Sequence, residues 1–367
     1  MTTDVIPRVA TLRAGFIGGG FMAAVHSRAA RAARAEIAAI ASSTTAGARA
    51  AAEALGAETA FDTPADLLAD DDVDVVHVCT PNASHAAIAR AALEAGHHVV
   101  CEKPLATAST DAAALVALAA ERGLVATVPF VYRFHPMARE ARARVAAGET
   151  GRVLSVHGAY LQDWMADPAS DDWRVDPESG GPSRAFADIG SHLVDLVEFI
   201  VGDRIARVQA TTRIAHAERG GREVRTEDLA AVLAEFAGGA IATLLVSQVA
   251  PGHKNGLVVE VSGTDRSVRF EQERPEELWV GGNDGTGLVA REPGALSPDA
   301  ARLSLVPAGH PMGYQDAFNA FVADTYAAIT GGAPDGLPTF ADGLRAVRVT
   351  EAVLASAASG TWQEVVA

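Results

Sequence analysis

The sequence predicts two α/β units: a doubly wound parallel sheet over residues 9–130, and an open, mostly antiparallel sheet with helices on one face over residues 131–367. Residues 12–128 alternate short apolar runs with alanine-rich helical patterns, which favours parallel strands joined by crossover helices. A glycine-rich turn separates the first apolar run from the first helical pattern. After residue 150 the pattern changes to long stretches of alternating polar and apolar residues, as expected of antiparallel strands with one covered face.

The elements of the first half follow from these apolar runs and helical patterns. The predicted strands are residues 12–17, 36–41, 73–79, 97–101 and 124–128. The predicted helices are residues 21–34, 46–55, 64–68, 84–95 and 110–122. Gly96 and Gly123 follow two of these helices, at the position where a left-handed glycine commonly ends a helix.

The glycine-rich turn is residues 18–23, in which Gly18, Gly20 and Ala23 form the pattern G-x-G-x-x-A. Gly18 allows a sharp turn from strand to helix, Gly20 lets a pyrophosphate approach the backbone, and Ala23 lets the helix pack closely on the strand. The helix that begins after the turn directs free N–H groups and its positive dipole end toward bound phosphates. The turn therefore predicts a dinucleotide-binding Rossmann domain, with Phe21 and Met22 beside the cofactor.

Polar residues follow three of the predicted strands, and ligands of such sheets gather at these carboxyl ends. The second strand ends at Ser42 without the acidic residue that holds the ribose diol of NAD, and Arg49 lies one helical turn on. The choice between NAD and NADP therefore stays open, and a simple helix-capping loop is an equal alternative.

Two further strands end in charged or polar motifs. One is followed by Thr80-Pro81-Asn82-Ala83-Ser84-His85, where Ser84 is a candidate helix cap and a plain loop is the alternative interpretation. The next is followed by Glu102-Lys103-Pro104, which places two charges at the edge of the sheet where the nicotinamide would lie. The alternative for this pair is an exposed salt-bridging turn.

The second half begins with a crossover over residues 129–147, which contains Tyr132 and an arginine- and alanine-rich helix. The alternating stretches that predict strands are residues 152–160, 205–215, 228–237, 240–248, 257–262 and 267–271. We expect surface turns over residues 273–300 and helices over residues 314–329 and 340–356.

Residues 161–203 interrupt this sheet with tryptophans and polar side chains, a combination that suits a polyhydroxylated ligand whose C–H faces pack on rings. Asp188 and His192 are four residues apart, so they share one face of a helix. A neighbouring carboxylate raises the pKa of an imidazole, while burial and a nearby lysine lower it, so we expect the pKa of His192 within about one unit of ~6.5. The alternative is a helix-capping Asp188 and a half-buried structural His192.

The composition excludes several functional classes. The net charge of −16 argues against nucleic acids and anionic membranes as partners. Two cysteines, Cys79 and Cys101, indicate a reduced protein without a disulfide framework or a cysteine-based metal site, and we expect no metal. Without an apolar signal region at the N-terminus, we expect a cytoplasmic location.

Together, the glycine turn, Thr80-Pro81-Asn82-x-x-His85, Glu102-Lys103-Pro104 and Asp188-x-x-x-His192-x-x-Asp195 resemble the Gfo/Idh/MocA family of glucose-fructose oxidoreductase and inositol dehydrogenase. The resemblance covers nearly the whole chain. Residues 160–164, 173–174 and 310–314 are similar to the levoglucosan-dehydrogenase-like branch of that family. In three places the chain departs from the family: Ala23 replaces the usual third glycine, Ser42 stands where NAD-preferring members often carry an acid, and Tyr132 where many have asparagine.

The resemblance implies site residues of three kinds. Lys103 stabilises negative charge on the reacting oxygen, His192 accepts the proton, and Asp188 orients His192 or binds a neighbouring hydroxyl. The implied cofactor-binding residues are Gly18, Gly20, Phe21, Met22, Ser42, Thr80, Asn82, His85, Glu102, Lys103, Pro104, Tyr132, Trp173 and Arg174. The implied substrate-binding residues are Lys103, Tyr132, Tyr160, Gln162, Trp164, Asp188, His192 and Tyr314.

The implied function is hydride transfer between the nicotinamide of NAD, or NADP, and a ring hydroxyl of a sugar, anhydrosugar, glycoside or cyclitol, with C3 favoured. Two alternatives stay open: a redox-neutral cycle in which transient oxidation drives elimination or glycoside cleavage, and a non-catalytic nucleotide-binding regulator. Because a large open sheet leaves an apolar face, we also expect a homo-oligomer, a dimer or tetramer, assembled through the C-terminal sheet.

Overall fold

The structure, a computed structural model, describes residues 11–366, so the predicted domain start at residues 9 and 10 lies outside the described residues. The first sheet is parallel throughout, in the order β3-β2-β1-β4-β5-β6. Its strands are β1 (Arg13–Ile17), β2 (Glu36–Ala41), β3 (Thr59–Phe61), β4 (Val75–Val78), β5 (His98–Cys101) and β6 (Ala126–Thr127). The five predicted strands are confirmed as elements, and β3 was missed because three residues are too few to show a period.

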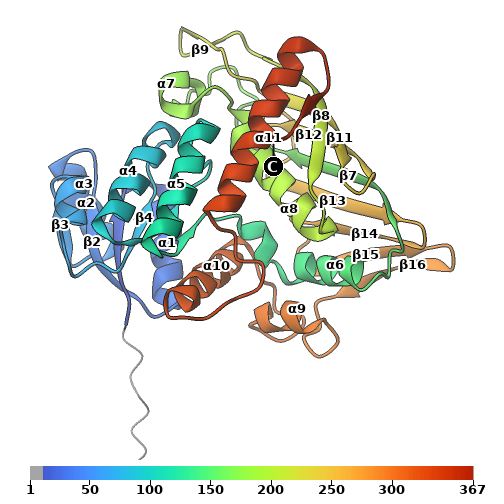
Figure 1. The fold of residues 1–367 in the computed structure, drawn as a ribbon, viewed down its shortest axis with the longest axis horizontal. Helices are drawn as coiled ribbons and strands as arrows, with labels where there is room; N and C mark the ends of the chain where they lie inside the picture. The colour runs from blue at the N-terminus through green and yellow to red at the C-terminus, as the bar shows by residue number, and fades with distance from the viewer. Residues whose placement is uncertain (1–10, 367) are drawn as a thin grey trace, which may run out of the picture.

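The crossover helices lie on both faces of this sheet, at the left of Figure 1. They are α1 (Phe21–Ala32), α2 (Thr45–Leu55), α3 (Pro64–Leu68), α4 (Asn82–Ala95) and α5 (Ser109–Arg122). Gly96 and Gly123 end α4 and α5 with positive φ values of 96° and 64°, as predicted. The prediction that Ser84 caps α4 is wrong: α4 begins at Asn82, and the Ser84 hydroxyl lies 2.7 Å from the Pro81 carbonyl oxygen.

The second sheet has nine strands in the order β16-β15-β14-β13-β7-β12-β11-β8-β17, and of its strand pairs only β7 and β12 are parallel. Its strands are β7 (Val153–Leu161), β8 (Ile205–Arg213), β11 (Leu229–Phe236), β12 (Ile241–Ser247), β13 (Gly256–Gly263), β14 (Arg266–Glu271), β15 (Glu277–Gly282), β16 (Gly285–Ala290) and β17 (Gln363–Glu364). A separate ribbon pairs β9 (Glu218–Arg219) with β10 (Arg222–Glu223).

The prediction of surface turns over residues 273–300 is wrong for most of that segment. It contains β15, β16 and the start of α9 (Pro298–Leu303). Glycines and acidic residues mask the alternation of buried Leu278 and Val280, and the ladder to β14 stabilises a strand that local propensity does not indicate.

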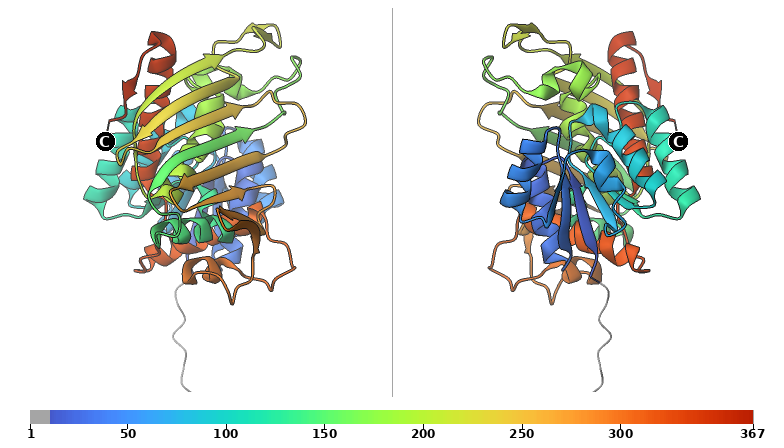
Figure 2. Two further views of the ribbon diagram at one scale, coloured as in Figure 1. Left: turned by 90° about the vertical axis from the view of Figure 1, so that its right-hand side faces the viewer. Right: turned by 90° about the vertical axis from the view of Figure 1, so that its left-hand side faces the viewer.

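Helices cover only one face of the second sheet, as predicted (Figure 2). Helices α6 (Pro136–Ala146), α8 (Ser191–Val201) and α11 (Phe340–Ser359) bury that face, and their side chains share one apolar core with the strands. The short α7 (Pro177–Gly180) lies above α4, between the two domains (Figure 1). The opposite face of the sheet carries no helix.

The chain returns to the first domain at its end. Helix α10 (Tyr314–Ile329) packs against α1, and its Phe318 and Phe321 join the core that contains Phe16 of β1. The first turns of α11 bury Phe340 and Leu344 in the core on the other side of the parallel sheet. These helices hold the two sheets together, and the space between the sheets forms the site described next. Across residues 11–366, no helix combines the length and the apolar character needed to cross a bilayer.

Candidate active site

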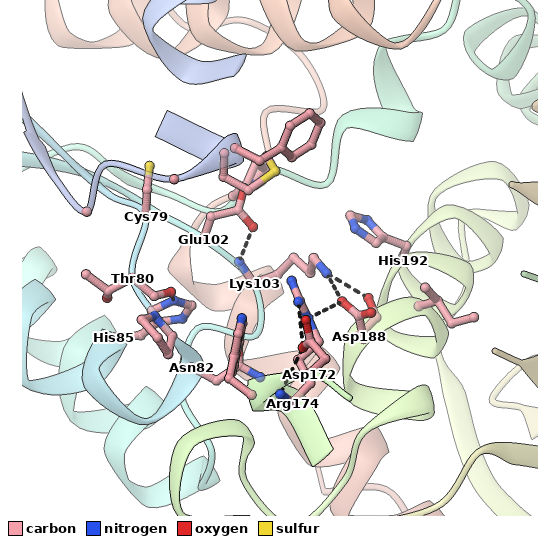
Figure 3. A pocket seen from close by; sticks show the side chains of 18 of the residues that line it. Cys79, Thr80, Asn82, His85, Glu102, Lys103, Asp172, Arg174, Asp188 and His192 are labelled. Atoms are coloured by element: carbon pink, nitrogen blue, oxygen red, sulfur yellow. Dashed lines mark hydrogen bonds and ion pairs between the residues drawn. The ribbon is translucent and has the colours of Figure 1, made fainter. Parts of the chain in front are cut away.

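One cavity of about 810 Å³ lies where the carboxyl ends of the parallel strands face the second sheet (Figure 3). Its lining is Gly18, Gly19, Gly20, Phe21, Met22, Ser42, Ser43, Cys79, Thr80, Pro81, Asn82, His85, Glu102, Lys103, Pro129, Tyr132, Tyr160, Gln162, Trp164, Asp172, Trp173, Arg174, Asp188, Ile189, His192, Asn255 and Tyr314. Every candidate residue from the sequence lines it except Pro104. The Pro104 carbonyl instead accepts a hydrogen bond from His85 Nδ1 at 2.7 Å, so Pro104 shapes the turn and does not contact the cavity.

The glycine turn forms one end of the cavity. Gly18 has φ of +102°, and a Cβ atom there would lie 2.5 Å from the Cys79 carbonyl oxygen, so only glycine fits. A Cβ on Gly20 would meet nothing within 4 Å, which leaves the backbone open to a ligand. No side chain caps the start of α1, so its first N–H groups remain free to bind an anion. This end therefore fits a pyrophosphate.

The end of β2 supplies hydroxyl groups beside the glycine turn. Ser42 and Ser43 line the cavity, whereas Thr44 caps α2 by accepting a hydrogen bond from Gly47 N at 3.0 Å. The helix-capping interpretation is confirmed for Thr44, whereas cofactor contact by Ser42 stays a prediction.

The loop after β4 is tied down on two sides. His85 is 1% exposed, and its ring joins the Pro104 and Thr80 carbonyl oxygens, so it is not a surface histidine. Asn82 Nδ2 donates to the Gly180 carbonyl oxygen at 2.9 Å, which links α4 to the second domain. These contacts fix the part of the cavity wall that the loop after β4 forms.

Lys103 extends across the cavity from the end of β5 (Figure 3). Its Nζ donates to Asp188 Oδ1 at 2.5 Å and to the Asp188 carbonyl oxygen at 3.0 Å. Glu102 is 6% exposed, and its Oε2 accepts the backbone N–H of Lys103 at 3.1 Å. The pair is thus not an exposed salt-bridging turn: each charge points into the fold.

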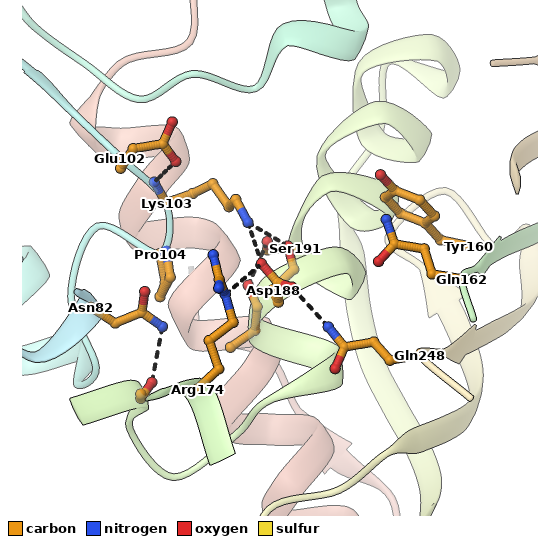
Figure 4. A network of polar contacts seen from close by, with 12 residues as sticks. Asn82, Glu102, Lys103, Pro104, Tyr160, Gln162, Arg174, Asp188, Ser191 and Gln248 are labelled. Atoms are coloured by element: carbon orange, nitrogen blue, oxygen red, sulfur yellow. Dashed lines mark hydrogen bonds and ion pairs between the residues drawn. The ribbon is translucent and has the colours of Figure 1, made fainter. Parts of the chain in front are cut away.

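Asp188 lies in a π-helical turn, Phe186–Gly190, directly before α8. Its carboxylate accepts hydrogen bonds from Lys103 and from Gln248 Nε2 at 2.7 Å, and Arg174 Nε lies 3.7 Å away (Figure 4). Burial raises the pKa of Asp188, but the Lys103 and Arg174 cations outweigh burial and bring it to about 2. Asp188 is therefore ionised across the neutral pH range.

His192 lies on α8 with its ring edge-to-face against Phe130 and Tyr132 at 5.7 and 5.0 Å between centroids. Its Nδ1 is buried and has no hydrogen-bond partner among residues 11–366. Burial, together with the Lys103 cation, lowers the pKa of His192 to about 3. The expected value near ~6.5 is wrong, because the Asp188 carboxylate binds Lys103 and leaves the imidazole without a compensating partner. The expected Asp188–His192 pair is thus replaced by an Asp188–Lys103 pair.

The far wall of the cavity is a network of aromatic and amide groups. Tyr160 OH donates to Asn255 Oδ1 at 2.6 Å, and Gln162 Nε2 donates to the same oxygen at 2.9 Å. Asn255 Nδ2 donates to Tyr132 OH at 3.2 Å, and Trp164 Nε1 donates to Gln162 Oε1 at 2.9 Å. The network holds side chains from three segments of the chain in one polar surface.

The rim is formed by a short 3₁₀ turn, Trp173–Val175, which Asp172 caps through Arg174 N at 2.9 Å. The Arg174 guanidinium lies 4.3 Å from the Trp173 ring centroid and 6.0 Å from that of Trp164. Tyr314, at the start of α10, lines the cavity beside Tyr132. A cation stacked on two rings at the opening suits the binding of a flat or polyhydroxylated molecule.

Sequence reasoning missed several residues of this site, among them Asp172, Gln248 and Asn255. Gln248 holds Asp188, and Asn255 holds Tyr160 and Gln162. Each lies far along the chain from its partners or in a loop without a recognisable motif, so only the tertiary fold identifies it.

Comparison with known proteins places these features in context. The family model described as "Oxidoreductase family, NAD-binding Rossmann fold" matches residues 12–130, and the model described as "GFO/IDH/MocA C-terminal domain" matches residues 138–269. Levoglucosan dehydrogenase of Pseudarthrobacter phenanthrenivorans is 33% identical, over 96% of this chain and 98% of that protein.

Solved structures give the same result. An oxidoreductase domain protein from Kribbella flavida is 38% identical with a TM-score of 0.91, and the match covers 98% of this chain and 100% of that chain. A levoglucosan dehydrogenase in complex with NADH and levoglucosan is 33% identical with a TM-score of 0.91, covering 97% of this chain and 99% of that chain.

Proposed function

The chain belongs to the GFO/IDH/MocA family of NAD-binding oxidoreductases, and on that premise we propose that it is a dehydrogenase that oxidises a ring hydroxyl of a neutral sugar. The substrate class we propose is a pyranose, an anhydrosugar or a glycoside, with C3 as the reacting carbon. The observation that carries this proposal is the meeting of Lys103, Asp188 and His192 in one cavity with the glycine turn.

The cofactor site is supported by the glycine turn and the free start of α1, which fit a pyrophosphate. Thr80, Glu102 and Lys103 line the same cavity and would hold the rest of a dinucleotide bound there. Two solved relatives were determined as complexes with NADH or NAD⁺, which supports NAD as the cofactor. Ser42 and Ser43 replace the usual acid at the ribose, so we propose that NADP is tolerated.

Bound NAD⁺ supplies the hydride acceptor. We assign the role of proton acceptor to His192. Its pKa is lowered to about 3, so the imidazole is neutral at pH 7 and can accept the proton of the substrate hydroxyl. Lys103 Nζ donates two of its three N–H groups to Asp188, and the third remains to stabilise negative charge that develops on the reacting oxygen. Asp188 orients Lys103 by accepting from its Nζ, and Gln248 and Arg174 hold Asp188 in place.

The polar wall supports a neutral, polyhydroxylated substrate. Its amide and phenol groups offer hydrogen bonds without a full charge, and Trp164 presents a ring that is 38% exposed. The cations of the cavity, Lys103 and Arg174, both lie close to Asp188, whose negative charge offsets part of their attraction for a substrate phosphate. A sugar ring without a phosphate is therefore the ligand that this chemistry favours.

A substrate screen tests the proposal. Purified protein is mixed with NAD⁺ or NADP⁺ and with levoglucosan, free pyranoses, methyl glycosides and inositols, and NADH absorbance is followed. We expect stoichiometric NADH with at least one neutral sugar and none with glucose 6-phosphate. Sugar conversion without net NADH points to the redox-neutral cycle, and nucleotide binding without conversion of any sugar points to a regulator.

We further propose that two or four copies assemble through the open face of the second sheet. Three large apolar side chains are exposed on that face: Leu233 on β11 (50% exposed), and Ile241 (57%) and Leu245 (39%) on β12. Together they form an apolar surface. A hollow of about 540 Å³ lies over the same strands. Large exposed apolar surfaces on soluble proteins mark association sites.

A further inference from the structure

A chain of buried polar side chains runs behind the cavity, away from the substrate. Tyr326 OH on α10 lies 2.7 Å from His77 Nε2 on β4, and His77 Nδ1 lies 2.8 Å from His26 Nδ1 on α1. His26 Nε2 lies 3.0 Å from Glu102 Oε1, at the end of β5. Both histidines are 0% exposed and Tyr326 is 5% exposed. Of these four residues only Glu102 lines the cavity.

The donors and acceptors of this chain fit one arrangement of neutral rings. A carboxylate only accepts, so His26 Nε2 carries the proton and donates to Glu102. His26 Nδ1 is then an acceptor, and His77 must donate to it from its own Nδ1. His77 Nε2 in turn accepts from Tyr326 OH. All three donors therefore point toward Glu102, and their aligned dipoles solvate its charge.

We propose that His26, His77 and Tyr326 are positioning residues that hold Glu102 as a carboxylate beside the nicotinamide, and so make the site favour the oxidised over the reduced cofactor. This inference rests on the proposed function, because it takes the nicotinamide to lie between the glycine turn and Lys103. The oxidised ring carries a positive charge and the reduced ring carries none, so a fixed negative charge beside the ring distinguishes the two forms.

The groups that face Glu102 favour its ionised, carboxylate form. Burial raises the pKa of Glu102, but His26 and Lys103 lower it below its ordinary value. Burial lowers the pKa of His77, which keeps it neutral as the chain requires. The other titratable neighbours are Cys79, Cys101, His85, His192 and Tyr314, and burial shifts each pKa toward the neutral form.

Tyr326→Phe removes the last donor, which lies outside the cavity, and so tests the chain without touching the cofactor. His77 Nε2 is then a buried acceptor without a partner. If His77 instead changes tautomer and carries its proton on Nε2, the unprotonated Nδ1 atoms of His77 and His26 face each other with their lone pairs. Proton uptake by the Glu102–His26 pair relieves the mismatch, so the pair loses its net negative charge at a higher pH than in the wild type.

The experiment measures Kd for NAD⁺ and for NADH by calorimetry and by NADH fluorescence, between pH 5.5 and 8.5. The wild-type ratio Kd(NAD⁺)/Kd(NADH) should be flat across this range. In Tyr326→Phe the ratio should rise about three- to tenfold as the pH falls, because part of the negative charge beside the nicotinamide is lost over this range. The matched control is Thr325→Val, which removes the neighbouring buried hydroxyl of the same helix. That hydroxyl bonds the Phe321 carbonyl and Thr127, which do not belong to the chain that ends at Glu102. It should behave as the wild type.

Glu102→Gln is the second variant, in case Tyr326→Phe fails to fold. In Glu102→Gln the ratio Kd(NAD⁺)/Kd(NADH) should be higher than in the wild type at every pH and should not change with pH. An unchanged ratio in Glu102→Gln, or an equal loss of affinity for both cofactor forms in Tyr326→Phe, overturns the inference and leaves a purely structural chain. A wild-type protein that binds neither form counts instead against the proposed function.

Discussion

Replacing Lys103 by methionine removes one cation from the cavity and keeps a side chain of similar length. Lys103 Nζ makes two contacts, with Asp188 Oδ1 at 2.5 Å and with the Asp188 carbonyl oxygen at 3.0 Å. Asp188 retains Gln248 Nε2 at 2.7 Å, so the π-helical turn should keep its place. The substitution therefore isolates the contribution of the ammonium group.

Two effects of known sign follow. A preorganised donor at a developing oxyanion contributes about 2.7–4 kcal/mol, so kcat for sugar oxidation should fall about 10²- to 10³-fold. The Lys103 cation also lowers the pKa of His192, which is about 3 in the intact site, and without it that pKa should rise toward its ordinary value. Oxidation requires unprotonated His192, so the pH at which kcat/KM falls should move upward.

The assay is steady-state NADH formation between pH 4 and 9, with the best sugar from the screen. The control is Lys254→Met, since Lys254 is the other lysine of the chain and its side chain is 76% exposed beside Asp163. The kcat of that variant should stay within about twofold of the wild-type kcat, because an exposed ion pair contributes little. Near-normal turnover in Lys103→Met would refute the role of Lys103, and an acid limb that stays in place or moves down would refute the electrostatic coupling to His192.

Four other outcomes are expected. His192→Ala should lose about 10²- to 10⁴-fold in rate, and near-normal turnover in this variant would exclude His192 as the base. Asn255→Ala should raise the sugar KM about tenfold or more with the Kd of NAD⁺ unchanged, since it frees Tyr160 and Gln162; equal losses in both would mean misfolding. Leu233→Asp should turn an oligomer into a monomer by light scattering, and a monomeric wild type would contradict the interface. Burial lowers the pKa of His135 to about 4. Between about pH 4 and ~6.5, His135 is therefore protonated in the unfolded chain but not in the folded protein. Urea unfolding at pH 5 should therefore show about 2 kcal/mol less stability from this group than at pH 7, and His135→Phe should remove that loss.

Short motifs determined the first half of the site from sequence alone. Gly18, Gly20 and Ala23 act through the local backbone, and Lys103 follows a strand whose neighbours are set by the crossover topology, so their proximity is a property of the chain order. The strands of both sheets could be predicted wherever alternation or an apolar run exceeded four residues. The acidic, glycine-rich segment that forms β15 and β16 could not, because its pairing with β14 decides its conformation.

The tertiary structure alone decided which charges meet. Sequence spacing suggests that Asp188 serves His192, but the fold carries Lys103 from the other domain to within 2.5 Å of that carboxylate, and burial then leaves His192 neutral. Asn255, Gln248 and the chain from Tyr326 to Glu102 likewise join residues far apart in sequence. Local sequence specifies backbone conformation and side-chain type, whereas hydrogen-bond partners and pKa values depend on distances and burial that exist only after the two sheets have packed together.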